Sequence, residues 1–377
     1  MRIAYFTESL PPLTDGVSLT LSKLADWLQK SDVEFLFFSP FKPDTKFGWV
    51  ENVRQVFSVP FPLYREYRVS VPMFDNLYKE LDQFKPDIIH VAAPTPLGIV
   101  GVNYAEEQRI PAVSSYHTHF VSYFKYYGFH PLENLGWAYL RWFHNRCQTT
   151  YAPSVSARNE LLSRGIKLVE VWPRGVNVNN FSTTYRNNEL RKSIGAIYLP
   201  ILLFVGRLVK EKDLDDLIEA DSLLKSWGNK YKLVIIGDGP MRPELSECIP
   251  DAYFTGYLKG KPLSEWYASS DIFVFPSTTE TFGNVVIEAF ASGLPVIGVR
   301  EGGVSDIIDS GQNGFLAEAN NPKDFAIKIQ MVLQNVALRK SMSLMAKKSA
   351  NQYSWEMVNT TLLHSYQKIL TNYCSKN

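Results

Sequence analysis

The sequence contains no apolar run close to the roughly 18 residues that a membrane-spanning helix requires, and it contains little cysteine. The three cysteines (Cys147, Cys248 and Cys374) are odd in number and scattered, so neither a disulfide framework nor a zinc site is indicated. A formal net charge of +1 lacks the basic excess of a nucleic-acid-binding domain. The opening residues, MRIAYFTESL, run straight into a strand without a signal-like segment. We therefore expect a cytosolic protein that folds without metal or disulfide and has no nucleic-acid partner.

At 377 residues the chain is long for one hydrophobic core, and its 45% hydrophobic and 20% charged content is typical of a globular protein. Strand-like and helix-like segments alternate along it, which is the pattern of parallel sheets covered by helices. The first series has strands RIAYF, EFLFFSP, PDIIHVAA and PAVSSYH, with helices over about 17–30 and 97–109. The second has strands ILLFVG, YKLVIIG, AYFTGY and IFVFPS, with helices near 213–227, 240–248 and 262–269.

These two series predict an α/β protein of two Rossmann-like domains. We expect a first domain over residues 1–172 and a second over 173–352. The last segment, 353–377, contains the amphipathic stretch YSWEMVNTTLLHSYQKIL, which we expect to form a helix that packs back on the first domain.

Two glutamates with seven residues between them stand out in TETFGNVVIEAFASGLPVI, residues 278–296. Glu280 follows a buried strand, and Glu288 lies within the next helix, roughly 9 Å further along at 1.5 Å per residue. Ligands of open α/β sheets bind at the carboxyl ends of the strands. The spacing therefore suggests one extended polar ligand that is held at two points.

Two other strand-to-helix turns are candidates for phosphate binding. Asp15 and Gly16 precede a helix that Thr14, Asp15 or Ser18 caps; a glycine there permits close approach of a phosphate, although a plain cap and turn explains the same residues. Arg207 and Lys212 lie before a helix start, where cations oppose the helix dipole. A bound anion explains that placement, and solvated surface is the alternative.

Two further patterns do not identify a cofactor. IIGDGPMR begins like a dinucleotide fingerprint with Gly237 and Gly239, but Arg242 stands where the third glycine belongs, which argues against an NAD-dependent dehydrogenase. The acidic run from Asp213 to Asp216 is the ordinary arrangement for the first turn of a helix, and we assign no metal to it.

Taken together, these segments resemble glycosyltransferase family 4 of the GT-B fold over nearly the whole chain. FVGRLVKEKDLDDLIEA, IIGDGP and DIFVFPSTTETFGNVVIEAFASGLPVI occur in the family's order, and Glu280 with Glu288 matches its glutamate–seven–glutamate motif. WPRGVNVNNF resembles the family's interdomain segment, and REGGVSDIIDSGQNGFL its closing glycine-rich segment. The resemblance is strongest to the α-mannosyltransferase and sulfoquinovosyltransferase-like branch.

The resemblance implies that the two domains face each other across a cleft. It also implies that the second domain binds a nucleoside-diphosphate sugar and needs no divalent metal or other cofactor. Arg207 and Lys212 would stabilise the departing diphosphate. Glu280 would accept hydrogen bonds from hydroxyls of the donor sugar and Glu288 from the ribose diol. The remaining donor-binding residues that it implies are Gly16, Gly237, Phe282, Gly283, Asn284 and Val285.

His117, in SSYHTHF, matches the family histidine that lines the donor sugar, and we assign structural roles to His90 and His119. The resemblance also implies that the anomeric configuration is retained. Since no paired carboxylates suit double displacement, we expect front-face attack by the acceptor, with the leaving diphosphate taking its proton.

Two residues depart from the family pattern in the turns that approach the phosphates. Asp15 stands where many members have a glycine, and its carboxylate would repel a diphosphate unless it caps the helix. Asp213 also replaces a common glycine, so we expect a slightly different turn there.

The acceptor is expected to be a lipid or a glycan, bound by the first domain. Residues 120–146 hold ten aromatics and three Lys or Arg, a composition that suits contact with the inner face of a membrane; an aromatic core helix pair is the alternative. Tyr64, Arg65, Tyr67 and Arg68 form a smaller basic–aromatic patch, which we assign to solvated surface.

Two other functions remain open at this stage. A nucleotide-sugar epimerase or hydrolase of related fold would form product from the donor alone. A non-catalytic sugar-nucleotide-binding protein would bind the donor without turnover, although it has less need of the charges around the leaving group. The sequence does not name the sugar, the base or the acceptor.

Overall fold

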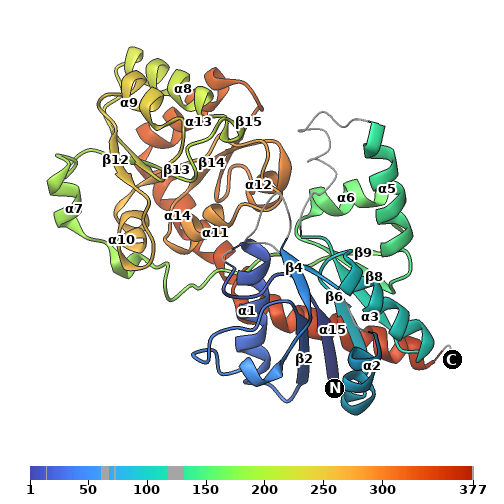
Figure 1. Cartoon of the computed structure of the whole chain (residues 1–377). Helices are drawn as coiled ribbons and strands as arrows, with labels where there is room; N and C mark the ends of the chain where they lie inside the picture. The colour runs from blue at the N-terminus through green and yellow to red at the C-terminus, as the bar shows by residue number, and fades with distance from the viewer. Residues whose placement is uncertain (14, 61–67, 72–73, 118–130, 376–377) are drawn as a thin grey trace. The chain divides into compact units, whose positions relative to one another are not determined.

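A computed structural model describes residues 1–13, 15–60, 68–71, 74–117 and 131–375 of the chain. These residues form two compact units (Figure 1). Unit 1 comprises Met1–Pro173 together with Val358–Asn377, and unit 2 comprises Arg174–Met357. Each unit has its own sheet and its own hydrophobic core.

Unit 1 contains a seven-stranded sheet in which every neighbouring pair is parallel. Its order is β3 (Val53–Gln55), β2 (Glu34–Ser39), β1 (Arg2–Phe6), β6 (Ile88–Val91), β7 (Ala112–Ser115), β8 (Thr149–Ala152) and β9 (Val169–Val171). A short antiparallel pair, β4 (Ser58–Pro60) with β5 (Arg68–Ser70), lies outside this sheet. The helices are α1 (Gly16–Leu28), α2 (Phe74–Phe84), α3 (Pro96–Glu107), α5 (Pro131–His144), α6 (Val155–Ser163) and most of α15 (Trp355–Cys374).

The central strand β1 shows how the sequence produces this layering. Ile3 and Tyr5 point to one face of the sheet, into a core that α1 and α15 complete, whereas Ala4 and Phe6 point to the other face, towards α2 and α3. A strand buried on both faces reads as a continuous apolar run, as RIAYF does. Tyr366 of α15 lies in the first of these cores, so the C-terminal helix packs on unit 1 as expected.

Unit 2 contains a six-stranded sheet that is also parallel throughout. Its order is β12 (Tyr253–Gly256), β11 (Lys232–Ile236), β10 (Ile201–Val205), β13 (Ile272–Val274), β14 (Val296–Val299) and β15 (Gly314–Ala317). The helices are α7 (Asn188–Ser193), α8 (Leu214–Ser226), α9 (Arg242–Cys248), α10 (Lys261–Ser269), α11 (Asn284–Ala291), α12 (Gly302–Ile307), α13 (Pro322–Gln334) and α14 (Val336–Gln352).

Both units therefore have the alternating α/β organisation that the sequence predicts, and the fold class is confirmed. The expected helices are present, and they begin and end within two residues of the expected positions. For example, the segment expected near 213–227 is α8, Leu214–Ser226. In the described part of the chain, no helix is both long enough and apolar enough to cross a bilayer.

Candidate functional site

In unit 2 the strand order reverses direction between β10 and β13. β10 is the unit's first strand along the chain; β11 and β12 follow on one side of it, and β13 to β15 on the other. Ligands of open α/β sheets bind at such a switch point, outside the carboxyl ends of the strands. The loop after β10 (residues 206–213) and the loop after β13 (residues 275–283) meet at this edge, and together with α11 they carry most of the predicted site residues.

Lys212 and Glu280 join these two loops directly. The Nζ atom of Lys212 donates a hydrogen bond to Oε1 of Glu280 at 2.5 Å, and the two side chains are only 13% and 25% exposed. Because an ammonium has three donors and a carboxylate has two oxygens, each group retains capacity for a ligand. Arg207 lies on the same loop but is 75% exposed, with its guanidinium 3.8 Å from Glu211, so the structure does not bring it into the pair.

The conformation and contacts of Asp213 explain why an aspartate can stand at this turn, where many family members have a glycine. Its φ is 52°, in the left-handed region that glycine adopts freely, so the turn keeps a glycine-like backbone. Its carboxylate accepts hydrogen bonds from the backbone N–H and the hydroxyl of Thr278, both at 2.8 Å. The substitution therefore adds a connection between the two loops, a role that the sequence analysis did not find.

Glu288 lies on α11, and its carboxylate is paired with a buried phenol. The hydroxyl of Tyr267, on α10, donates to Oε2 of Glu288 at 3.0 Å. Burial raises the pKa of Glu288 to about 7, and the hydrogen bond from Tyr267 only partly opposes this rise. The carboxyl group is therefore poised to change its charge near neutral pH, and sequence reasoning gave no sign of its tyrosine partner.

The start of α11 presents a sharp turn and an unsatisfied acceptor. Gly283 has a φ of 97°, and a Cβ there would lie 3.1 Å from Cγ2 of Val304, so the position requires glycine. The Oδ1 atom of Asn284 is buried and has no hydrogen-bond partner among the described residues. A ligand donor at this place would satisfy it.

Phe282, Val285 and Gly237 have structural roles that limit how they can contact a ligand. Phe282 is 3% exposed, with its ring 5.9 Å from that of Tyr353, which leaves its backbone as the part available to a donor. The carbonyl of Val285 lies 3.4 Å from the hydroxyl of Tyr267. A Cβ on Gly237 would lie 1.8 Å from the carbonyl oxygen of Gly206, so close packing of two loops already requires glycine there.

In unit 1, Gly16 begins α1 and Asp15 is its N-cap. The carboxylate of Asp15 accepts from the N–H groups of Val17 and Ser18, each at 2.8 Å, and therefore caps the helix. Of the three candidate caps, Thr14 lies outside the described residues. His117 follows β7 and is half-buried, with its ring 5.5 Å from that of Trp172. His90 is fully buried and holds α15, as discussed below, whereas His119 is not among the described residues.

The aromatic segment 120–146 is described only from residue 131, and Tyr64, Arg65 and Tyr67 are not described. Its described part forms α5, which has two sides. Trp137, Leu140 and Phe143 are buried, whereas the exposed hydrophobic residues of α5 are Leu135 (66%), Tyr139 (37%) and Trp142 (49%). The guanidinium of Arg146 lies 5.0 Å from the Trp142 ring centroid. One side of α5 is therefore part of the core, and the other is an exposed apolar surface whose contact with a membrane stays a prediction.

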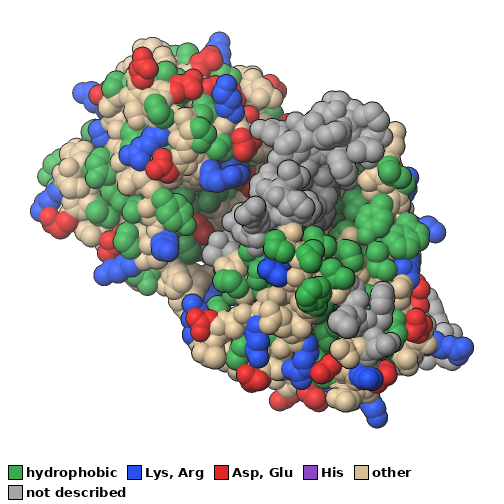
Figure 2. All heavy atoms as spheres, in the orientation of Figure 1, with side chains coloured by type: hydrophobic (Ala, Val, Ile, Leu, Met, Phe, Trp, Pro, Cys, Tyr) green, Lys and Arg blue, Asp and Glu red, His purple; other side chains and the backbone are tan. Residues whose placement is uncertain are grey.

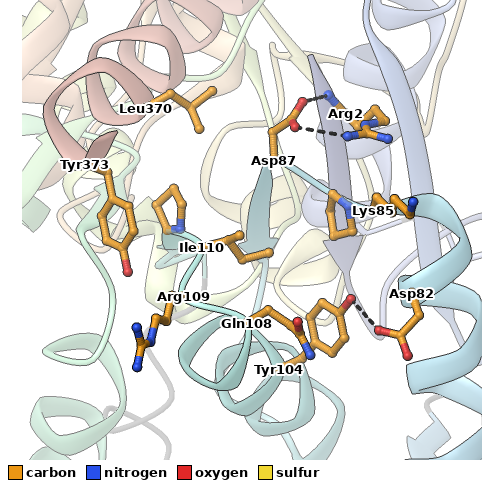
Figure 3. Close-up of a pocket in the computed structure, with 12 residues that line it drawn as sticks. Arg2, Asp82, Lys85, Asp87, Tyr104, Gln108, Arg109, Ile110, Leu370 and Tyr373 are labelled. Atoms are coloured by element: carbon orange, nitrogen blue, oxygen red, sulfur yellow. Dashed lines mark hydrogen bonds and ion pairs between the residues drawn. The ribbon is translucent and has the colours of Figure 1, made fainter. Parts of the chain in front are cut away.

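A cavity of about 570 Å³ lies elsewhere in unit 1, at the amino ends of its strands (Figure 3). Arg2 of its lining bonds to Asp87, and the hydroxyl of Tyr104 donates to Asp82 at 2.9 Å. The cavity is on the edge of the sheet opposite to the strand ends where ligands bind, and much of its polar lining is paired internally. We assign no substrate to it. Among the described residues, no three His, Cys, Asp or Glu side chains gather as a metal site would require.

Comparison with known proteins agrees with this geometry. The family model for Glycosyltransferase Family 4 matches residues 14–180, and that for Glycosyl transferases group 1 matches residues 199–335. A GDP-mannose-dependent alpha-mannosyltransferase of Corynebacterium glutamicum is 34% identical over 98% of this chain and 89% of its own. The sulfoquinovosyl transferase SQD2 of Arabidopsis thaliana is 34% identical over 96% of this chain and 72% of its own.

Solved structures give the same fold. Anabaena HepE in complex with UDP superposes with a TM-score of 0.76 at 19% identity, covering 98% of this chain and 100% of that one. Sucrose-phosphate synthase from Thermosynechococcus elongatus has a TM-score of 0.74 at 17% identity, covering 98% and 99%. The fold is therefore GT-B, and the chain belongs to glycosyltransferase family 4.

Proposed function

We propose that the protein is a retaining glycosyltransferase that moves a hexose from a nucleoside-diphosphate sugar to a hydroxyl group of a lipid or glycan acceptor. The observation that carries this proposal is the partly buried Lys212–Glu280 pair, which places a cation and a carboxylate together at the switch point of unit 2. The donor is GDP-mannose or a UDP-sugar, since sequence relatives are named for GDP-mannose and HepE was solved with UDP.

Lys212 and Arg207 would carry the positive charge that the diphosphate needs, so that no divalent metal is required. Lys212 can reach a phosphate oxygen with the donors that Glu280 does not use. Arg207 is exposed and free to swing towards a bound anion. Fixed cations at the leaving group act where negative charge develops in the transition state.

The two glutamates would hold opposite ends of the donor. Glu280, on the loop after β13, would accept from hydroxyls of the sugar, and Glu288, on α11, from the ribose diol. The buried Oδ1 of Asn284 supports a ligand at the start of α11, because an unsatisfied acceptor there is costly without one. The backbone of Gly283 would lie beside the phosphate or sugar.

In the mechanism we propose, the acceptor hydroxyl attacks the anomeric carbon from the face that the diphosphate leaves. The bond between the anomeric carbon and the phosphate oxygen breaks, the new glycosidic bond forms, and the departing diphosphate takes the hydroxyl proton. The configuration is thereby retained without a covalent enzyme intermediate. In this mechanism His117 would stabilise the positive charge that develops near the anomeric carbon.

We propose that the acceptor is amphiphilic and that the protein, in the cytoplasm, binds it at the inner face of a membrane. Figure 2 shows hydrophobic side chains gathered over α5, where Leu135, Tyr139 and Trp142 are exposed beside Arg146. Aromatic rings flanked by cations suit the headgroup layer of an anionic membrane. A relative from Acholeplasma laidlawii, 26% identical over 95% of this chain and 94% of its own, is named alpha-monoglucosyldiacylglycerol synthase, which supports a lipid.

The proposed donor site is tested by calorimetric titration of the purified protein with UDP, GDP and ADP in EDTA, alongside NAD. We expect micromolar binding of one nucleoside diphosphate without metal, which would also identify the base. The anomeric configuration of the product is then read by NMR after incubation with the matching donor sugar. Binding of NAD alone, or of no nucleotide, would contradict the proposal, and an inverted product would exclude the retaining mechanism.

A further inference from the structure

Unit 1 has a switch point of its own, between β1 and β6, and a carboxylate lies beside it. Glu8 is the second residue after β1, so it lies at the carboxyl end of this strand. In the sheet, β2 and β3 lie on one side of β1, and β6 to β9 lie on the other. By the same rule that places the donor in unit 2, a ligand of unit 1 is expected at this edge.

The described surroundings of Glu8 are neutral hydrogen-bond donors. The backbone N–H of Ser70, in β5, donates to its Oε1 at 3.3 Å. The hydroxyl of Thr95 opposes the rise that burial causes in the pKa of the same carboxylate. Its oxygen also accepts from the N–H of Gly98 and caps α3. No lysine or arginine in the described part of unit 1 neutralises this carboxylate.

The described residues leave part of the acceptor capacity of Glu8 unused. A carboxylate has about four lone-pair positions, and the described chain occupies only part of them. Glu8 is half-buried, and burial raises its pKa although Thr95 and Ser70 oppose the rise. A partly buried carboxylate without a cation is costly unless further donors reach it.

The surface beside Glu8 is apolar. The hydroxyl of Tyr139, on α5, donates to the carbonyl of Pro94, next to Thr95, at 2.7 Å. Burial raises the pKa of Tyr139, and the charge of Glu8 adds to this rise. Trp142 lies on the same exposed side of α5, with its ring 5.7 Å from that of Tyr139. Val71, which follows Ser70, is 46% exposed. A carboxylate at a strand end thus adjoins an exposed apolar surface.

We propose that Glu8 is an acceptor-binding residue whose carboxylate accepts a hydrogen bond from a hydroxyl group of an amphiphilic acceptor, while the acceptor's apolar part lies on the exposed side of α5. The inference rests on the proposed glycosyltransferase function and extends it to the acceptor. Glu8 is not asked to remove the proton, which leaves with the diphosphate. Its substitution should therefore affect acceptor binding more than the chemical step.

The test compares Glu8→Gln, which keeps the shape and removes the charge, with Glu51→Gln. Glu51 is exposed in a short turn of the same unit (Val50–Asn52) and serves as the matched control. Transfer from the donor identified by calorimetry is measured to dioleoylglycerol in mixed micelles and, separately, to octyl α-mannoside. The two probes distinguish a glycerolipid hydroxyl from a sugar hydroxyl.

For Glu8→Gln we expect the KM of the accepted probe to rise about tenfold, because the hydrogen bond to a charged carboxylate becomes a weaker one to a neutral amide oxygen. The kcat, the Kd of the nucleoside diphosphate and the unfolding midpoint should stay near those of Glu51→Gln. Glu8→Asp, which keeps the charge but withdraws it by one methylene, should lie between wild type and Glu8→Gln.

The outcomes separate this inference from the proposed function. Unchanged acceptor KM in Glu8→Gln, with active wild-type enzyme, overturns the role of Glu8 alone. A parallel loss of nucleotide affinity and stability would also overturn it, since it would show a structural role. Transfer from the wild-type protein to neither probe overturns the inference alone. If the wild-type protein binds no nucleotide, the proposed function fails and the inference fails with it.

Discussion

The carboxylate of Asp213 accepts hydrogen bonds from both the backbone N–H and the hydroxyl of Thr278, each 2.8 Å long, across 65 residues of sequence. This connection fixes the loop after β13 against the loop after β10. Lys212 directly precedes Asp213, and Glu280 follows Thr278 by two residues. Lys212 and Glu280 form the ion pair of the proposed donor site. The structure therefore makes Asp213 a positioning residue for that pair.

Replacement of Asp213 by glycine should weaken donor binding without disturbing the backbone. Glycine adopts a φ of 52° more readily than aspartate, so any loss reports on the missing hydrogen bonds and not on strain. We expect the Kd of the nucleoside diphosphate to rise about tenfold, as for hydrogen bonds to a charged group. The measurement is calorimetric titration in EDTA.

The control for this prediction is Asp215→Asn, which changes an exposed acid in the first turn of α8. It should leave nucleotide affinity at the wild-type value. Equal affinities for wild type and Asp213→Gly would show that the two loops hold the pair without help from Asp213.

Lys212→Ala should lower turnover more than donor affinity. The ammonium of Lys212 is largely buried and fixed by Glu280, so it can act on a leaving diphosphate without prior rearrangement. Loss of such a preorganised charge costs on the order of 10²–10³ in kcat. Steady-state kinetics with the identified donor give both kcat and KM.

Lys210→Ala, two residues earlier in the same short turn, provides the comparison, because it removes a lysine that has no assigned role. A variant of Lys212 with wild-type kcat would remove this residue from the mechanism.

Glu288 should make donor binding depend on pH near neutrality. Its pKa of about 7 means that its carboxyl is largely protonated at pH 6 and ionised at pH 8. In the proposed donor site the ionised form would accept hydrogen bonds from both ribose hydroxyls, so donor affinity should rise with pH through about 7. Glu288→Gln should bind more weakly at pH 8 and lose this pH dependence; a parallel pH dependence in the variant would assign it to another group.

The raised pKa of Glu288 has the opposite effect on stability, which should decrease as pH rises. The pKa of Glu288 is raised above the usual value of 4.5, so between about 4.5 and 7 the folded protein holds a proton that the unfolded chain releases. The contribution of Glu288 to the free energy of unfolding is thus present below pH 4.5 and declines as pH rises through 7. Urea unfolding of Glu288→Gln should lack this decline, which isolates it from other titrating groups.

Most strands were predictable because they are continuous apolar runs, and the helices between them follow from their periodicity. β8 (TTYA) and β9 (VEV) escaped prediction, since buried threonines and a three-residue strand give no such run. Their place in the sheet comes from pairing with β7 and with each other, which sequence periodicity does not record. The sheet order itself is likewise a tertiary property.

The candidate site was predictable to the extent that its residues lie in strand-to-helix loops. The Lys212–Glu280 contact was not, because the two residues are separated by 68 positions. The role of Tyr267 was not predictable either, because a tyrosine in a helix is most simply interpreted as a core residue. Only the structure shows its hydroxyl beside Glu288. Gly237 was assigned to the donor, whereas its closest constraint is the carbonyl of Gly206. Burial and long-range pairing decide these roles.

Trp142→Ala should weaken binding to anionic vesicles. The indole is 49% exposed on α5 and lies under the guanidinium of Arg146, so it can enter the headgroup layer beside a cation. Loss of about 1.5–3 kcal/mol of apolar transfer corresponds to roughly tenfold or more in the partition constant. Sedimentation with phosphatidylglycerol vesicles measures it. Trp227→Ala, which removes a 36%-exposed tryptophan in unit 2, is the control and should not alter partitioning.

Tyr366→Phe should destabilise unit 1 without affecting nucleotide binding. The hydroxyl of Tyr366, on α15, bonds to Nδ1 of His90, whose Nε2 lies 2.5 Å from Oγ of Ser115; all three residues are buried. Burial lowers the pKa of His90 to about 3, so the ring is neutral and depends on these partners. An unsatisfied buried nitrogen costs about 1–3 kcal/mol.

The measurement for Tyr366→Phe is urea unfolding at pH 7.5, with Tyr198→Phe, which changes a 96%-exposed tyrosine, as the control. Because the unfolded chain protonates His90 near pH 6.5 and the folded protein does not, the contribution of His90 to the free energy of unfolding should fall as pH drops from about 6.5 towards 3. His90→Gln should lose this part of the acid dependence. A Tyr366→Phe protein as stable as the Tyr198→Phe control would mean that the hydroxyl does not hold α15 on the sheet and that apolar packing of Val358 and Leu362 is sufficient.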